Sequence, residues 1–226
     1  MSHPKIFGIG FHKTGTSSLG AALKQLGLRV TGPNGLRNPH IAQEVYQIAF
    51  SLVDKYDAFQ DNPMVYARLP DKYASFCQFT FVRNPFDRLV SCYRNKVAQL
   101  RHDERLRYGK FSGSGAISSD VSFEEFVAIV CRVPDYLANH HFRSQVATVG
   151  KKRPEFIGRF EKLSADWEQL AKQYDFPTAL CHANSSKNLA GFSADYRTYY
   201  TPDLAANVYR RYKKDFKTFG YGKQIF

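Results

Sequence analysis

A loop of glycines, hydroxyl side chains and one lysine is the part of the sequence best suited to chemistry. It runs from Gly10 to Ser18, after a short apolar run that is typical of a buried strand and before a segment with helical spacing. A strand–loop–helix turn gathers backbone N–H groups and the positive end of a helix at one point, which favours an anion. Gly10 and Gly15 allow close backbone approach, and Lys13 adds a positive charge. The hydroxyl donors are Thr14, Thr16, Ser17 and Ser18.

The position of the lysine distinguishes two kinds of group transfer. In nucleotide-hydrolysing loops of the form G-x-x-x-x-G-K-[ST], the lysine follows the second glycine. Here Thr16 stands in that place and the lysine is Lys13, two residues before Gly15. No convincing acidic strand end is available for magnesium. The pattern therefore favours transfer of a sulfuryl group, which carries less charge and needs no metal. A P-loop nucleotide kinase is the alternative.

The same loop resembles one known family. The residues FHKTGTSSL at positions 11–19 are similar to the 5′-phosphosulfate loop of sulfotransferases that use 3′-phosphoadenosine-5′-phosphosulfate (PAPS). The resemblance implies that Lys13 contacts the bridging oxygen and assists the leaving phosphate. It also implies that the loop binds the cofactor through His12, Lys13, Thr14, Gly15, Thr16, Ser17 and Ser18.

A second motif follows the apolar run at 76–82. Arg83 stands at its end, and Ser91 comes about two helical turns later. An arginine at a strand end can bind a phosphate through two N–H groups, and a serine can add a hydroxyl. Alone, the pair could equally be a surface ion pair and a solvent-facing serine. The stretch RNPFDRLVSCY resembles the 3′-phosphate motif of the same family, closest to its Golgi-type carbohydrate branch.

Three further residues are candidates at the acceptor side of the site. An acceptor hydroxyl must lose its proton to a nearby base. The resemblance places that base just after the second strand, at Asp61, although an aspartate before Asn62-Pro63 is also an ordinary turn residue. His141, in a cluster with Arg143 and Gln145, is the rival. Lys187 is either a solvated lysine or a side chain that closes over the cofactor.

Alternating strands and helices must position these residues. Apolar runs predict strands at 5–10, 57–60, 76–82 and 156–160. Apolar periodicity and capping signals predict helices at 17–26, 41–55, 85–101, from 123 onward, 166–174 and from 201 to the residue before Gly220. The pattern predicts an α/β fold, and with the resemblance a P-loop-like three-layer fold in which helices flank a central parallel sheet. We expect one sulfotransferase domain over 1–226, with a surface loop or insert at 102–121.

Charge and composition limit the remaining possibilities. The chain has 226 residues and a formal net charge of +12, which favours an anionic ligand or partner. A basic nucleic-acid-binding protein is therefore a second alternative. Neither a signal peptide nor a membrane-length apolar stretch is visible, and Cys77 and Cys92 resemble buried free thiols. We expect a cytoplasmic enzyme that uses PAPS and a small-molecule or glycan acceptor, with no metal, nucleic acid or stable membrane insertion.

Overall fold

The structure of the protein is a computed structural model. It describes residues 6–9, 14–15, 18–19, 21–22, 77–102, 108–111, 115–118, 120–138, 141–149, 154–176, 193 and 195–225. The chain divides into two compact units. Unit 1 comprises residues 1–82 and 147–184, and unit 2 comprises 83–146 and 185–226. The expected helix at 41–55 and strand at 57–60 lie outside the described residues.

Unit 1 contains a parallel sheet with strand order β1-β2-β5. Its strands are β1 (Ile6–Ile9), β2 (Cys77–Val82) and β5 (Phe156–Arg159). Ile9 pairs with Thr80, and Val82 pairs with Arg159, so all three carboxyl ends lie at one edge of the sheet. The predicted α/β fold with a parallel sheet is therefore confirmed, and the strand predicted at 156–160 ends one residue earlier.

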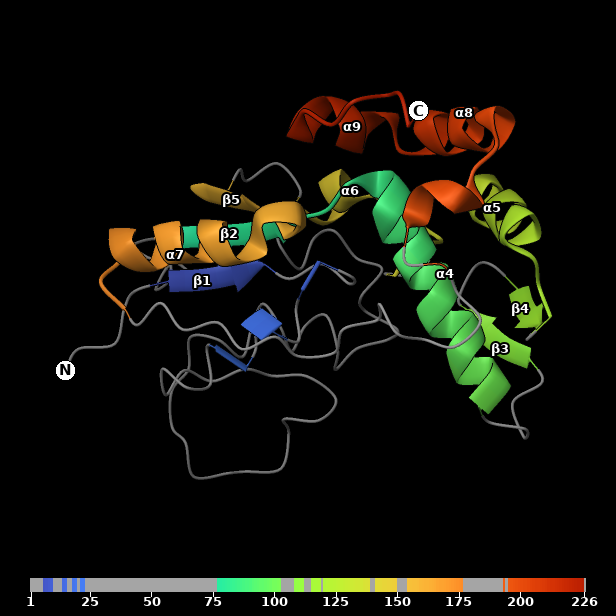
Figure 1. Ribbon diagram of the computed structural model, residues 1–226, viewed down its shortest axis with the longest axis horizontal. Helices are drawn as coiled ribbons and strands as arrows, with labels where there is room; N and C mark the ends of the chain where they lie inside the picture. The colour runs from blue at the N-terminus through green and yellow to red at the C-terminus, as the bar shows by residue number, and fades with distance from the viewer. Residues whose placement is uncertain are drawn as a thin grey trace. The chain divides into compact units, whose positions relative to one another are not determined.

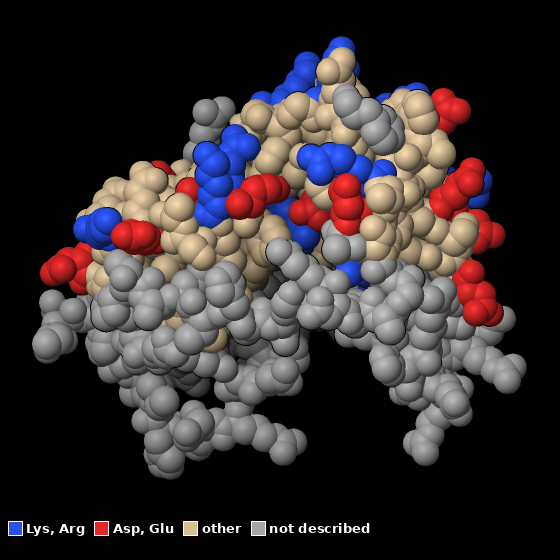
Figure 2. All heavy atoms as spheres, in the orientation of Figure 1, with Lys and Arg blue, Asp and Glu red and all other residues tan. Residues whose placement is uncertain are grey.

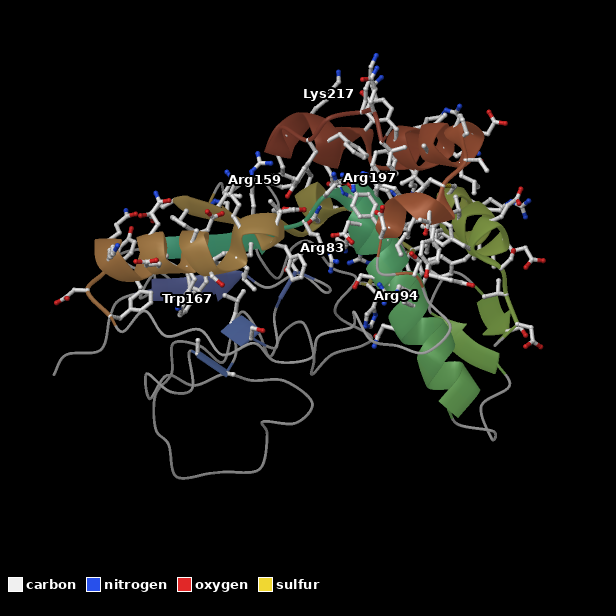
Figure 3. The ribbon with its side chains drawn as sticks, viewed as in Figure 1. Arg83, Arg94, Arg159, Trp167, Arg197 and Lys217 are labelled. Atoms are coloured by element: carbon white, nitrogen blue, oxygen red, sulfur yellow. The ribbon has the colours of Figure 1, made fainter. Side chains whose placement is uncertain are left out.

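Aromatic side chains of the sheet and of helix α7 (Leu163–Gln173) form the core of unit 1. Trp167 is fully buried and its ring lies 6.4 Å from that of Phe79 in an edge-on arrangement. In Figure 3, Trp167 lies on the side of α7 that faces the strands. A short 3₁₀ helix, η2 (Phe160–Lys162), joins β5 to α7. The strand end at Arg159 is thereby tied directly to the helix that covers the sheet.

Unit 2 is mainly helical (Figure 1). Its long helix α4 runs over Pro85–His102, within one residue of the expected end, and α5 runs over Phe123–Arg132. The predicted capping box of α5 is confirmed, because Ser122 Oγ accepts from the Glu125 N–H while the Glu125 carboxylate accepts from the Ser122 N–H. Buried side chains of α4, α5 and the C-terminal helices form one apolar core. Helix α6 (Gln145–Val149) begins in unit 2 and continues into unit 1.

The stretch expected to be a surface loop or insert, 102–121, contains an antiparallel hairpin of β3 (Tyr108–Phe111) and β4 (Gly115–Ser118). One prediction about unit 2 is wrong in part. The last helix begins and ends as expected, with a Thr201 cap and a left-handed Gly220, but it breaks at Tyr212. The two parts are α8 (Pro202–Arg211) and α9 (Lys213–Phe219), preceded by a 3₁₀ helix, η4 (Tyr196–Tyr199).

Cys77 and Cys92 are buried free thiols, as predicted. Among the helices that the structure describes, none is both long and apolar enough to span a membrane. Basic side chains gather over α8 and α9 (Figure 2), where Arg210, Lys213 and Lys214 are exposed.

Candidate functional site

The phosphate-loop residues that can be placed follow strand β1. Thr14 and Ser18 are buried, and Gly15 has a positive φ of 83°. The Leu19 N–H donates to the Gly15 carbonyl over 3.0 Å, which closes the first turn of a helix that includes residues 18, 19, 21 and 22. The predicted change from loop to helix is therefore confirmed at these residues. The other predicted loop residues, His12, Lys13, Thr16 and Ser17, lie outside the described residues.

Two physical demands require glycine at position 15. A positive φ is costly for any residue with a Cβ atom. In addition, a Cβ at this position would lie 2.9 Å from Leu163 Cδ2 and 3.3 Å from Phe160 Cδ2. Both side chains lie where β5 passes into α7, so Gly15 packs on the segment that follows β5. Gly15 belongs to the loop whose N–H groups are the expected anion donors.

Arg83 directly follows the last residue of β2, and its side chain is held by Asp87. Arg83 Nε and Nη2 donate to the two carboxylate oxygens of Asp87, each over 2.8 Å. The Arg83 and Asp87 side chains are only 11% and 20% exposed. The ion-pair interpretation is therefore correct as to the contact, but the pair does not lie on an open surface. A two-point bond of this kind orients the guanidinium plane.

Ser91 lies on the same face of α4 as Asp87, because the two residues are four apart within the helix. Arg83 stands before the first residue of the helix and is joined to this face by its ion pair with Asp87. Ser91 is 4% exposed, so the alternative of a solvent-facing serine is wrong. Arg83 and Ser91 are therefore both buried near the start of α4, and Figure 3 labels Arg83 close to that helix.

The backbone of Arg83 is also fixed, by a glutamine from the start of α6. The Arg83 N–H donates to Gln145 Oε1 over 2.9 Å, and Gln145 Nε2 donates to the Arg83 carbonyl over 2.9 Å. Gln145 is fully buried. The side-chain amide of Gln145 thus satisfies both the N–H and the carbonyl of Arg83, as a neighbouring strand would.

His141 lies in a turn whose backbone is tightly held. Arg88, a buried residue of α4, donates to the carbonyls of His141 and Arg143 over 3.2 Å and 2.9 Å. The Tyr212 hydroxyl donates to the carbonyl of Phe142. The His141 side chain itself is half-buried. Residues 141–143 form a turn.

The other two members of the predicted polar cluster have structural contacts. Arg143 is 6% exposed and donates to the carbonyls of Asp135 and Ala138 over 2.8 Å and 2.7 Å. Gln145 binds Arg83 as described above. Both side chains bind backbone groups of unit 2. These contacts do not support a role for Arg143 or Gln145 in binding the acceptor. Asp61 and Lys187, the other predicted site residues, lie outside the described residues.

A second charged network braces the turn beside Arg143. Asp135 accepts from Arg211 Nη2 over 2.7 Å, and also from the N–H and the hydroxyl of Ser144. Burial alone would raise the pKa of the Asp135 carboxyl, but Arg211 and the Ser144 hydrogen bonds outweigh it and lower the pKa. The Arg211 side chain is only 9% exposed, although it stands beside the exposed Arg210.

Comparison with known proteins identifies the family. The model of the Sulfotransferase family matches residues 4–222, which include both compact units. The chain belongs to the sulfotransferase family.

Several curated proteins are similar in sequence. Carbohydrate sulfotransferase 11 of Rattus norvegicus is 29% identical over 170 residues, which are 65% of this chain and 47% of that protein. Carbohydrate sulfotransferase 14 of Mus musculus is 31% identical over 107 residues, or 42% of this chain and 28% of that protein. Carbohydrate sulfotransferase 12 of Xenopus laevis is 25% identical over 175 residues, with 67% and 41% covered. The matches thus span at most about half the length of these relatives.

Among solved structures, a sulfotransferase from Alicyclobacillus acidocaldarius is a distant neighbour. It has a TM-score of 0.48 and 20% sequence identity over 96% of this chain and 94% of that chain. The family assignment rests on the sequence match.

Proposed function

We propose that the protein transfers a sulfuryl group from PAPS to a hydroxyl of a carbohydrate acceptor. Family membership supports sulfuryl transfer, and the similarity to three carbohydrate sulfotransferases supports the class of acceptor. The observation that carries most weight lies between β2 and the first turns of α4, where a buried arginine oriented by Asp87 is followed by a buried serine. Such a pair suits a phosphate group, because an arginine held by a carboxylate keeps its N–H groups in a fixed direction.

The two motifs have separate roles in this proposal. The loop after β1 binds the 5′-phosphosulfate through backbone N–H groups and the hydroxyls of Thr14, Thr16, Ser17 and Ser18. Arg83 and Ser91 bind the 3′-phosphate. An anion bound by backbone N–H groups at a glycine turn is a common arrangement, and the positive φ at Gly15 is consistent with it.

The reaction is a direct displacement at sulfur. The acceptor oxygen forms a bond to sulfur while the bond from sulfur to the bridging oxygen breaks, and 3′-phosphoadenosine-5′-phosphate (PAP) leaves. Lys13 neutralises the negative charge that develops on the bridging oxygen. The acceptor proton passes to a basic side chain, for which we propose Asp61, with His141 as the rival.

The identity of the base is tested by two variants. Asp61→Asn should lower turnover by about 10²–10⁴-fold while the affinity for PAP stays nearly unchanged, because only proton transfer is lost. His141→Ala should retain most of the activity. If the two results are reversed, the base is His141 and the assignment to Asp61 is wrong.

The donor is tested by thermal unfolding with different nucleotides. PAP at about one hundred times its dissociation constant should stabilise the protein by about 2.7 kcal/mol, in buffer containing EDTA as well as without it. ATP with magnesium should stabilise it far less. A strict requirement for magnesium, or a preference for ATP over PAP, would contradict the proposal and favour a nucleotide kinase.

A further inference from the structure

A buried hydrogen-bond network in unit 2 ends on the backbone of Arg83. Its first member is Asp215, in the first turn of α9, which is fully buried. The Asp215 carboxylate accepts from the N–H of Gln145 over 2.8 Å and from the N–H of Val146 over 2.9 Å. These are the first two residues of α6, whose leading N–H groups have no partner within the helix. Asp215 therefore fixes the position at which α6 starts.

The second member, Gln145, transfers this fixed position to Arg83. Its side-chain amide binds both backbone groups of Arg83, with both nitrogen–oxygen distances at 2.9 Å. Removing one partner of a buried hydrogen bond leaves a polar group without compensation, which costs more than the bond contributes. The network thus has few alternative arrangements, and the Arg83 backbone is held from a helix that lies 62 residues further along the chain.

The Arg83 side chain is oriented independently of this network, by Asp87 one helical turn away. Arg83 is therefore held at two points, its backbone by Gln145 and its guanidinium by Asp87. Holding both ends of a long side chain reduces the entropy lost when a ligand binds it. Burying these charged and polar groups costs free energy. Such an arrangement is expected where an arginine must bind a ligand in one geometry.

We propose that Gln145, fixed by Asp215, is a positioning residue for recognition of the nucleotide 3′-phosphate by Arg83. The proposal rests on the function proposed above and deepens it, because it assigns the donor specificity in part to residues that do not touch the donor. Gln145 and Asp215 act only through Arg83. Their loss should therefore affect nucleotides that carry a 3′-phosphate and spare those that lack one.

The experiment compares PAP with AMP, which lacks the 3′-phosphate, by isothermal titration calorimetry on the full chain. Gln145→Met keeps the side-chain volume and removes both hydrogen bonds to Arg83. We expect the dissociation constant for PAP to rise about 10-fold or more and that for AMP to change less than 3-fold. Asp215→Asn should show the same selectivity with a smaller change in the dissociation constant for PAP, because Asp215 acts on Arg83 only through Gln145. This second variant decides the question if Gln145→Met does not fold.

The control is Tyr93→Phe, which also removes one buried hydrogen bond to a backbone carbonyl of unit 2, that of Val121. The Tyr93 ring packs against Phe123 and Phe126, and loss of its hydroxyl should leave both dissociation constants unchanged. If the folded variants weaken PAP and AMP equally, or weaken neither, the positioning role is overturned although the proposed function stands. If the wild-type protein does not prefer PAP over AMP, both the positioning role and the proposed donor are overturned.

Discussion

Gly15 and Arg83 each follow a strand of the same parallel sheet, but the structure holds them by different forces. Gly15 is held by shape, because its backbone has a positive φ and a Cβ atom there would crowd the Leu163 and Phe160 side chains. Arg83 is held by polarity, through Asp87 on its side chain and Gln145 on its backbone. The first environment selects against added volume. The second selects for particular donor and acceptor atoms.

This difference predicts opposite sensitivities to mutation. Apolar packing tolerates a change of atom type better than a change of size. A buried polar network tolerates neither the loss of a partner nor its replacement by an apolar group, because the remaining partner stays unsatisfied. Substitutions at each position can therefore test whether the two motifs are built as described.

The largest effect on stability is expected at Gly15. Gly15→Ala should destabilise the protein by about 2–5 kcal/mol, since it adds strain at a positive φ to overpacking against Leu163. Urea unfolding measures the change. Gly222→Ala is the matched control, because a Cβ there has nothing within 4 Å and the change should stay within about 0.5 kcal/mol. Equal effects at the two glycines would contradict the packing account.

An intermediate effect is expected at Arg83, in ligand binding rather than in folding. Arg83→Ala should weaken PAP by about 1.5–3 kcal/mol, because a charge-assisted hydrogen bond to the 3′-phosphate is lost. Adenosine 5′-phosphosulfate, which lacks that phosphate, should be weakened much less. Arg132→Ala removes the same charge from an exposed position on α5 and serves as the control. Similar losses for both nucleotides would show that Arg83 does not bind the 3′-phosphate.

A smaller, pH-dependent effect is expected at Asp135. Its pKa is lower in the folded protein than in the unfolded chain, so the ionised carboxylate stabilises the fold above the unfolded pKa and loses this effect as the pH falls through the folded pKa. Asp135→Asn should therefore cost roughly 1–2 kcal/mol at neutral pH. The difference from wild type should shrink below about pH 4. Unfolding curves at several pH values measure it, and a difference independent of pH would argue against the ion pair with Arg211.

Local signals in the sequence were sufficient for much of the fold. The alternation of apolar runs predicted β2 and α4, and Ser122 with Glu125 predicted the start of α5, because capping depends only on neighbouring residues. Thr201, Pro202 and Gly220 likewise marked the two ends of the C-terminal helical segment. The hairpin at 108–118 was missed although a glycine-containing stretch between two short segments is a hairpin signal.

Tertiary contacts determined what local signals could not predict. No proline or glycine marks the break between α8 and α9 at Tyr212. The residues around it bind distant partners, since Tyr212 donates to the Phe142 carbonyl and Asp215 accepts from the Gln145 N–H. Arg211 stands in a run of basic residues that is typical of a solvated helix face, but its side chain is only 9% exposed because its partner is Asp135, 76 residues away. Gln145 was placed in an acceptor cluster by its neighbours in sequence, whereas its actual contact is the backbone of Arg83.

The most direct test of the account is a transfer assay with PAPS carrying a labelled sulfuryl group. The protein is incubated with a panel of neutral and acidic carbohydrates in the presence of EDTA, and PAP and labelled product are quantified together. We expect equal amounts of PAP and sulfated carbohydrate, and a large loss of rate in a folded Lys13→Ala variant. Intact PAPS with every acceptor, together with loss of the γ-phosphate from ATP when magnesium is supplied, would contradict the assignment of sulfuryl transfer.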